Sequence, residues 1–229
     1  MPAVFVTATG TEIGKTYVTV GLARCLRQRG RKVAVLKPVV SGFDPQAAAA
    51  SDPAVLLEAV GETPSLAAID SISPWRFTAP LSPDMAARRA GVAIDFAALV
   101  AFCREAAAHA EDVLLIEGIG GLMVPLDASS TVLDLIEALR IAPILVAGTY
   151  VGSLSHTLTA LETMQRRGIG IGALVLNETP GSAASPDETA ASLQNFCKAT
   201  SILILKRGAA QVDANANAAS FGKLTDLVL

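Results

Sequence analysis

The chain has 229 residues, which is enough for one large α/β domain or two small ones. Hydrophobic residues make up 52% of the chain and charged residues only 17%, a mixture that favours a parallel sheet covered by helices on both faces. The net charge is −3, so we expect no nucleic-acid partner.

The first predicted strand is Val4–Thr7, and it leads into a Gly-containing loop that ends in Gly14, Lys15 and Thr16. An amphipathic helix is predicted to follow over Thr16–Arg29. Backbone N–H groups and the dipole at the start of such a helix favour an anion. Lys15 adds a charge that reaches terminal phosphates, and the Thr16 hydroxyl is suited to Mg²⁺. The order of strand, loop and helix therefore predicts a nucleoside triphosphate site.

This loop departs from the general phosphate-loop pattern in one place. The pattern has a glycine five residues before Gly14, where this chain has Thr9, and the nearby glycine is Gly10. A chance Gly-Lys-Thr in a surface loop is the alternative interpretation. The following helix argues against it, because an apolar stripe recurs every four residues and Gly30 supplies a stop. The stripe consists of Val18, Leu22 and Leu26.

Strands and helices alternate through the rest of the chain. The further predicted strands are Val33–Leu36, Val113–Ile116, Ile144–Ala147, Ala173–Leu176 and Ile202–Leu205. The further predicted helices are Phe96–His109, Val132–Leu139, Leu154–Arg167 and Pro186–Lys198. Repeated β-α-β units favour a mostly parallel sheet with right-handed crossovers, whose ligands bind at the carboxyl ends of the strands. We therefore expect residues 1–229 to form a single α/β domain.

The region Ser41–Gly91 does not follow this alternation, because it is rich in Pro, Ser and Ala. We expect one helix in it, near Pro53–Val60, and otherwise an excursion that covers substrate. Long irregular loops inside compact domains are often functional.

A second acidic group is needed to hold Mg²⁺ beside the phosphate loop. Glu117 fits, because it directly follows the apolar strand Val113–Ile116 and precedes a glycine-rich turn. That turn, Gly118–Gly121, allows the backbone to approach phosphates closely. The alternative is a strand-end carboxylate beside an ordinary Gly turn.

Three further polar residues follow the second strand. Lys37 ends that strand and is expected to point into the ligand crevice, although a snorkelling surface lysine fits the same position. Ser41 follows in a loop. Asp52 comes just before Pro53 at a predicted helix start, so it is also suited to be an N-cap.

No membrane segment is predicted. Ile141–Leu161 contains no Asp, Glu, Lys or Arg, but its proline and glycines favour a buried strand, a Gly loop and a helix start. The three cysteines, Cys25, Cys103 and Cys197, are too few and too far apart for a disulfide framework or a metal site. We also expect no signal peptide, because the phosphate loop begins within about ten residues of Met1. We therefore expect a soluble cytoplasmic protein with reduced thiols.

Five segments resemble, in the same order, those of the dethiobiotin synthetase family of biotin biosynthesis. They are Phe5–Thr16 with its displaced glycine, Lys37–Gly42 (Lys-Pro-Val-Val-Ser-Gly), Phe77–Pro83, Glu117–Gly121 and Gly152–His156. The Lys-Pro-Val-x-Ser-Gly segment beside this loop variant is specific, whereas a phosphate loop alone is not. The resemblance implies a P-loop NTPase-like α/β fold with a mostly parallel sheet and helices on both faces.

The resemblance also implies a reaction: an ATP- and Mg²⁺-dependent ligase that closes the ureido ring of dethiobiotin from 7,8-diaminononanoate and CO₂. One amine of the substrate takes up CO₂ to form a carbamate. The carbamate attacks the γ-phosphate and gives a carbamic–phosphoric anhydride, which the second amine closes with loss of phosphate. Catalysis of this type is largely positioning and electrostatic stabilisation.

The matching positions imply individual roles. Lys37, Lys15 and Thr11 are implied to be catalytic. Substrate contacts are implied for Thr11, Lys37, Ser41 and Gly118, and also for Gly152, Ser153, Leu154 and Ser155, which serve the neighbouring subunit of a homodimer with its active site at the interface. ATP contacts are implied for Glu12, Ile13, Gly14, Lys15, Thr16, Tyr17, Asp52, Glu117, Gly118, Ile119, Gly120, Asn177 and Glu178. Thr16, Asp52 and Glu117 are implied to hold Mg²⁺.

The chain departs from the family pattern at three places. Asp84 stands where the family has His, and Ser155 stands where Asn is usual. Lys206–Ala209 replaces a Gly-x-Ile-Pro motif that lines the base pocket. The last departure leaves the nucleotide preference open.

Two other functions remain as alternatives. A nucleotide switch that dimerises and binds a partner protein has a similar loop, but such proteins typically carry an early lysine where this chain has Thr9–Thr11. A regulatory or amidotransferase-associated P-loop domain leaves Lys37 and Ser41 without a role.

Overall fold

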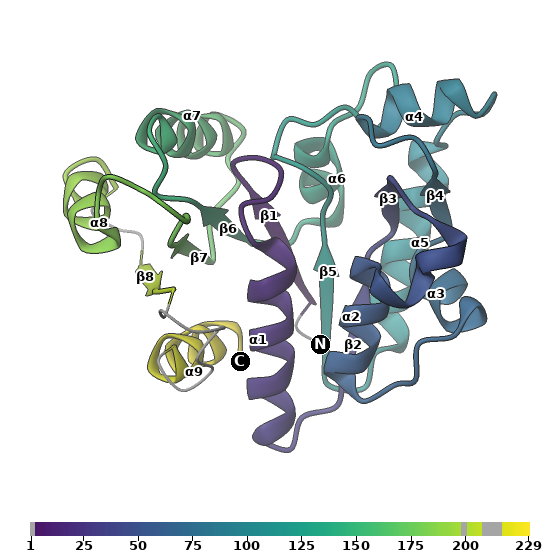
Figure 1. Cartoon of the computed structure of the whole chain (residues 1–229), viewed down its shortest axis with the longest axis horizontal. Coiled ribbons are helices and arrows are strands. Elements are labelled where there is room, and N and C mark those ends of the chain that lie inside the picture. Colours follow the sequence, from purple (N-terminus) through teal and green to yellow (C-terminus); the bar gives the residue numbers. More distant parts are fainter. Residues whose placement is uncertain (1–2, 198–200, 208–216) are drawn as a thin grey trace.

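The computed structural model describes residues 3–197, 201–207 and 217–229, and its centre is a six-stranded parallel sheet (Figure 1). The strand order is β2-β5-β1-β6-β7-β8. The strands are β1 (Ala3–Ala8), β2 (Val33–Leu36), β5 (Val113–Glu117), β6 (Pro143–Ala147), β7 (Ala173–Asn177) and β8 (Ile202–Leu205). Every neighbouring pair in this sheet is parallel, so the prediction from the repeated β-α-β pattern is confirmed.

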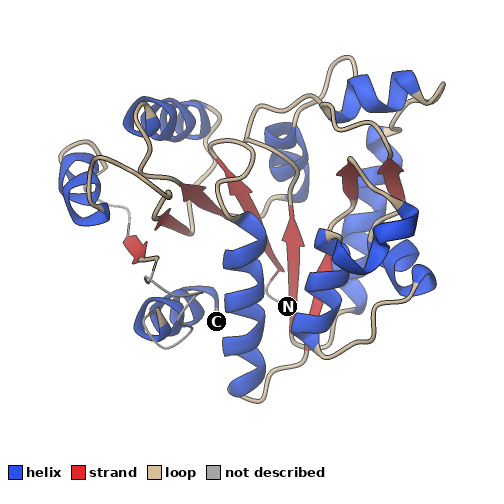
Figure 2. Ribbon diagram, viewed as in Figure 1, coloured by secondary structure: helices blue, strands red, loops and turns tan. Residues whose placement is uncertain are grey.

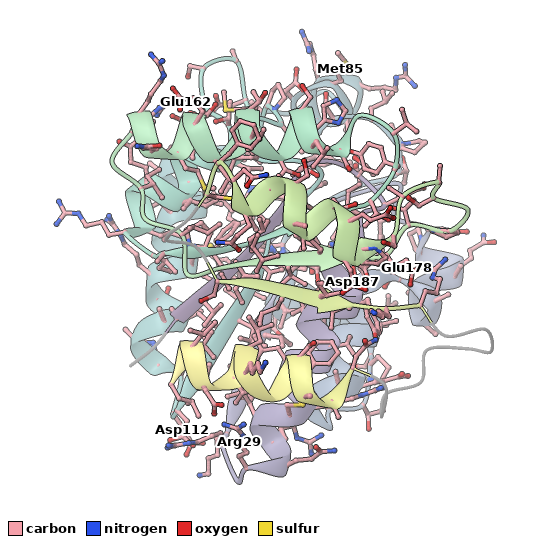
Figure 3. The ribbon with its side chains drawn as sticks, turned by 90° about the vertical axis from the view of Figure 1, so that its left-hand side faces the viewer. Arg29, Met85, Asp112, Glu162, Glu178 and Asp187 are labelled. Carbon is pink, nitrogen blue, oxygen red and sulfur yellow. The ribbon has the colours of Figure 1, made fainter. Side chains whose placement is uncertain are left out.

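Helices cover both faces of the sheet (Figure 2). On one face, α1 (Lys15–Gln28) packs between α2 (Asp52–Val60) and α9 (Ala218–Val228). The other face carries α5 (Phe96–His109), α6 (Val132–Leu139), α7 (Ser153–Arg166) and α8 (Pro186–Gln194). Figure 3 shows the β8 side of the sheet, with α8 above the strand and α9 below it.

The helix after β1 has the buried stripe that the sequence predicts. Val18, Leu22 and Leu26 are fully buried. Gly30 lies just beyond the helix with φ +76°, a left-handed conformation that glycine adopts without strain. The stripe holds α1 against the sheet, and its first turn is thereby fixed at the carboxyl edge of β1.

The region Ser41–Gly91 contains more regular structure than the sequence predicts. Besides α2, the structure has a 3₁₀ segment (Pro45–Ala50), helices α3 (Leu66–Ile72) and α4 (Pro83–Arg89), and a second parallel sheet of β3 (Val39–Ser41) and β4 (Trp75–Phe77). The helix predicted near Pro53–Val60 is confirmed as α2, but the expectation of a single helix is wrong because proline is tolerated in the first turn of a helix. Pro45 and Pro83 stand in the first turns of the 3₁₀ segment and of α4.

The uncharged segment Ile141–Leu161 forms β6, a glycine loop and the first part of α7, as predicted. No helix in the described part of the chain is long and apolar enough to cross a bilayer. The three cysteines are not in disulfides. Burial raises the pKa of the Cys103 thiol to about 12, so this side chain is an unreactive part of the core.

Candidate active site

The loop between β1 and α1 lies at the carboxyl edge of the sheet, where β5 and β6 flank β1 (Figure 1). Gly14 is the N-cap of α1 and has φ +101°. A Cβ at this position would lie 2.2 Å from Asn177 Nδ2, so both the backbone angle and the space require glycine. Lys15 Nζ donates a hydrogen bond to Gly10 O at 3.1 Å. The lysine therefore lies over the loop, where an anion would bind.

Charged residues from α2, from β5 and from the position directly after β2 meet beside this loop. Lys37 forms ion pairs with Glu117 and, at 2.8 Å, with Asp52. Thr16 Oγ1 donates to Glu117 Oε1 at 2.8 Å. Lys37 is buried, which rules out the surface-lysine alternative. The N-cap alternative for Asp52 is also wrong, because Ser51 is the N-cap of α2 and Asp52 is the first helical residue.

Burial and neighbouring charges shift the protonation of this cluster. Burial, together with the charge of Lys37, lowers the pKa of Lys15 to about 8. Burial also acts to lower the pKa of Lys37, but the carboxylates of Glu117 and Asp52 outweigh it and raise that pKa. Burial acts to raise the pKa of Asp52, whereas the charge of Lys37 and its hydrogen bond hold that pKa below its usual value. Lys37 and Asp52 are therefore a charged pair at neutral pH.

The oxygen atoms of this cluster fit a small hard cation. Glu117 is fully buried, and its Oε2 has no hydrogen-bond partner in the described part of the protein. An unpaired buried carboxylate oxygen is costly, so a ligand that pairs with it is favoured. The Thr16 hydroxyl and the Asp52 carboxylate supply further hard oxygen donors, which Mg²⁺ prefers. The described residues contain no cluster of three or more His, Cys, Asp or Glu, so phosphate oxygens would have to complete the coordination.

A cavity of about 300 Å³ opens beside the cluster. Its lining residues are Thr11, Glu12, Gly14, Lys15, Thr16, Lys37, Val40, Ser41, Asp52, Ile119 and Gly120. Ser41 is the last residue of β3 rather than part of a loop, so its expected loop position is wrong. The cavity thus places Thr11 and Ser41 together with both lysines and Asp52.

A second cavity, of about 150 Å³, lies beyond the phosphate loop on the side of β7 and β8. Its lining residues are Glu12, Ile13, Gly14, Tyr17, Asn177, Glu178, Thr179, Pro180, Lys206 and Arg207. Asn177 Nδ2 donates to Ile13 O at 2.9 Å. The Arg207 N–H donates to Glu178 Oε2 at 2.6 Å. Figure 3 shows Glu178 at the end of the sheet toward which β8 points. We call this space the outer cavity and the larger one the inner cavity; Glu12 and Gly14 line both.

Six of the residues expected at the site line neither cavity. They are Glu117, which lies buried behind the inner cavity in contact with Lys37 and Thr16, and Gly118, Gly152, Ser153, Leu154 and Ser155. Gly118 continues β5, and its N–H donates to Val6 O at 2.9 Å. The other four begin α7, where Leu154 and the neighbouring Val151 are exposed to solvent.

Sequence reasoning missed several residues that shape the cavities. Val40, Thr179 and Pro180 line them without any distinctive pattern in the sequence. Thr179 also joins two loops, because Thr149 and Thr179 each donate a backbone N–H to the other's hydroxyl at 3.0 Å. Only the segment that begins at Lys206 is distinctive in the sequence, because it replaces the motif expected there. Residues 208–216 of that segment lie outside the described residues.

The sequence matches proteins of one curated family over most of its length. An ATP-dependent dethiobiotin synthetase of Acidiphilium cryptum is 47% identical over 197 residues, which are 86% of this chain and 88% of the relative. That of Methylobacterium nodulans is 44% identical, covering 91% of this chain and 94% of the relative. That of Caulobacter vibrioides is 41% identical over the whole of both chains.

More distant comparisons agree with the fold. A family profile described as an AAA domain matches residues 2–212. The MinC:MinD cell division protein complex of Aquifex aeolicus contains a chain that superposes with a TM-score of 0.57 at 12% identity, covering 100% of this chain and 92% of that chain. The MinD ATPase of Pyrococcus furiosus gives 0.54 at 17% identity, covering 100% and 98%. At such low identity these structures show a common fold and no more.

Proposed function

Because the chain belongs to the ATP-dependent dethiobiotin synthetase family, we propose that it closes the ureido ring of dethiobiotin from 7,8-diaminononanoate and CO₂, with ATP as co-substrate. The enzyme is accordingly an ATP-dependent ligase of biotin biosynthesis. The observation that carries the proposal is the inner cavity, where Lys15, Lys37, Thr11 and Ser41 line one space beside the phosphate loop. We take residues 1–229 as one P-loop domain, since the buried apolar residues form one connected cluster.

The proposed reaction has three steps. An amine of diaminononanoate attacks CO₂ and loses a proton, which gives a carbamate. A carbamate oxygen then attacks the γ-phosphorus of ATP, and the bond to ADP breaks, which gives a carbamic–phosphoric anhydride. The second amine attacks the anhydride carbonyl, loses a proton and expels phosphate, so the ring closes. Two anions must therefore meet in the second step.

Positive charge in the inner cavity meets this demand. The Lys37 ammonium is held between Glu117 and Asp52, so it is fixed before any ligand arrives. A charge that needs no reorganisation stabilises developing negative charge better than a mobile one. Lys15 would bind the phosphates, and Lys37 would face the carbamate. Thr11 and Ser41, which line the same cavity, would orient the diamine.

Thr16, Asp52 and Glu117 would hold Mg²⁺, which would neutralise phosphate charge as the carbamate approaches. The unpaired Glu117 Oε2 supports this assignment. The phosphates would be surrounded by the segment Glu12–Tyr17 on one side and by the backbone of Gly118–Gly120 on the other.

The outer cavity would take the nucleoside part of ATP. Asn177 and Glu178 line it at the end of β7. Asn177 already uses one amide N–H on Ile13 O, which supports a fixed side-chain orientation for base recognition.

We further propose a homodimer that completes the substrate site. Gly152, Ser153, Leu154 and Ser155 line neither cavity of their own chain, and we assign their substrate contacts to the site of a second copy. The exposed apolar side chains of Val151, Leu154 and Met123 lie in the loops after β5 and β6 and at the start of α7, beside the phosphate loop. Val151 is 90% exposed, a cost that burial against a second subunit would remove.

The test is product formation. The protein is incubated with diaminononanoate, bicarbonate, Mg²⁺ and ATP, and dethiobiotin is measured by mass spectrometry, with parallel reactions that each omit one component. We expect dethiobiotin and ADP in equal amounts only in the complete mixture. Absence of product from protein that binds ATP would refute the proposal.

The nucleotide-switch alternative is not favoured. The similarity to MinD proteins extends to the fold alone, whereas the relatives at 41–47% identity are named as synthetases. The early lysine of such switches is also missing between Thr9 and Thr11.

A further inference from the structure

A buried asparagine, Asn217, forms hydrogen bonds with two residues that line the outer cavity but does not line the cavity itself. Asn217 precedes α9 and is buried, with only 2% of its surface exposed. Its Oδ1 accepts a hydrogen bond from the Lys206 N–H, and its Nδ2 donates to Lys206 O, both at 2.9 Å. The same Nδ2 donates to the Tyr17 hydroxyl at 2.9 Å. Lys206 and Tyr17 line the cavity, whereas Asn217 does not.

These bonds fix the cavity wall through its backbone. Lys206 directly follows β8, which is an edge strand of the sheet, so its backbone groups have no further strand to pair with. The Asn217 amide offers one acceptor and a donor group in the arrangement of a peptide bond, and it pairs with both backbone groups of Lys206. The wall is therefore held in place whatever the side chain at 206 does. The Lys206 side chain in fact points to an ion pair with Asp187.

The third hydrogen bond connects this wall to the phosphate loop. Tyr17 lies in the first turn of α1, directly after Lys15 and Thr16. Asn217 thus joins two sides of the outer cavity that come from opposite ends of the chain. The wall is also held from the β7 side, where the Arg207 N–H donates to Glu178.

We propose that Asn217 is a positioning residue that sets the distance between the Lys206–Arg207 wall and the phosphate-loop helix, and thereby the fit of the nucleotide base. This inference rests on the proposed nucleoside triphosphate site, with the base in the outer cavity and the phosphates in the inner one. It goes beyond that proposal because Asn217 touches neither ligand nor cavity. Loss of Asn217 should therefore weaken the binding of the base and leave the binding of the phosphates unchanged.

Two ligands separate these effects. ATP uses both cavities, whereas inorganic tripolyphosphate uses only the phosphate loop. We expect Asn217→Ala to raise the Kd of ATP about tenfold, since several hydrogen bonds that fix the wall are lost, and to change the Kd of tripolyphosphate by less than about twofold. Both are measured by calorimetric titration of the full chain in the presence of Mg²⁺.

Ser220→Ala is the matched control. Ser220 Oγ donates to Ile204 O at 2.7 Å, so it also connects α9 with β8, but it does not contact the wall of the cavity. We expect both Kd values to stay within about twofold in this variant. Asn217→Asp is a second variant in case Asn217→Ala does not fold, because it keeps the size of the side chain and one acceptor and loses only the amide donor. It should also weaken the binding of ATP and not that of tripolyphosphate.

Equal weakening of ATP and tripolyphosphate, or no change in either, would overturn the proposal. Failure of the proposed function is a separate result, because it would show as wild-type protein that makes no dethiobiotin. A wild-type protein that binds ATP more tightly than tripolyphosphate, and loses this difference in Asn217→Ala, supports the positioning role whatever the reaction.

Discussion

The inner and outer cavities lie on either side of one phosphate loop, yet they are built differently. The inner cavity uses the ends of β1, β2 and β5 and is shaped by buried charges, with Lys37 paired to Glu117 and Asp52. The outer cavity uses the ends of β7 and β8, and its wall is held through backbone hydrogen bonds. A charge depends on the identity of the side chain, whereas a backbone hydrogen bond does not. A change of side chain should therefore be tolerated better at Lys206 and Arg207 than at Lys37.

The largest effect is expected in the inner cavity, from Lys37→Ala. Loss of a fixed charge aimed at the reacting anions should lower kcat for ring closure by about 10²–10³-fold. In the presence of Mg²⁺, ATP should still bind, because the phosphate loop is intact. Steady-state kinetics and calorimetry measure the two effects separately.

Lys32→Ala is the control for that experiment. Lys32 precedes β2 and pairs with Glu111 on the exposed surface, so its loss should leave kcat unchanged. Normal turnover in Lys37→Ala would show that the carbamate site lies elsewhere.

The next effect concerns the packing that supports the outer cavity. A Cβ at Gly21 of α1 would lie 2.1 Å from the Phe221 ring of α9. Gly21→Ala should therefore destabilise the protein by about 1–3 kcal/mol through overpacking. Gly170→Ala is the control, because nothing lies within 4 Å of a Cβ there. Chemical denaturation followed by circular dichroism measures both, and equal stabilities would show that α9 packs differently on α1.

A smaller effect is expected from Asn177→Ala in the outer cavity. The variant should raise the KM for ATP about tenfold and leave the KM for diaminononanoate and kcat nearly unchanged, because one positioned amide is lost from base recognition. Asn195→Ala, an exposed asparagine after α8, serves as the control. A change in kcat rather than in KM for ATP would assign Asn177 to the inner cavity's chemistry.

The smallest effect is a proton taken up on nucleotide binding. The pKa of Lys15 is about 8, and the phosphates of ATP would raise it, so at pH 8 about half of the lysines must gain a proton. Below pH 7 Lys15 is already charged, and the uptake should vanish. Lys37 is charged throughout, because its pKa is raised. Titrations in buffers of different ionisation enthalpy measure the uptake, and a binding heat independent of buffer at pH 8 would contradict the lowered pKa.

The sequence predicts the inner cavity better than the outer one, for a physical reason. Lys37 and Glu117 end apolar strands, and parallel strands bring their carboxyl ends to one edge, so their proximity follows from the strand pattern. The stripe of α1 follows from its periodicity in the same way. The sequence leaves two interpretations of Asp52 open, an N-cap or a site residue, and only the position of the N-cap at Ser51 decides between them.

The features that the sequence does not predict depend on contacts between distant parts of the chain. Asn217 meets Tyr17 only because α9 packs beside α1, and no local pattern indicates this. Thr149 and Thr179 pair because β6 and β7 are neighbours in the sheet, although threonines in loops are common. In Ser41–Gly91 the helix α2 is predicted from the sequence, whereas the 3₁₀ segment and α4 are not, because a proline begins a helix as readily as it breaks one.

The transfer of an oxygen atom tests the proposed reaction most directly. The protein is mixed with diaminononanoate, Mg²⁺, ATP and ¹⁸O-labelled CO₂, quenched before the label exchanges with water, and the released phosphate is analysed by mass spectrometry. If the carbamate attacks the γ-phosphate in the inner cavity, each phosphate formed carries one ¹⁸O from CO₂. Phosphate that takes its new oxygen only from water would instead indicate plain ATP hydrolysis and would contradict the ring-closing mechanism.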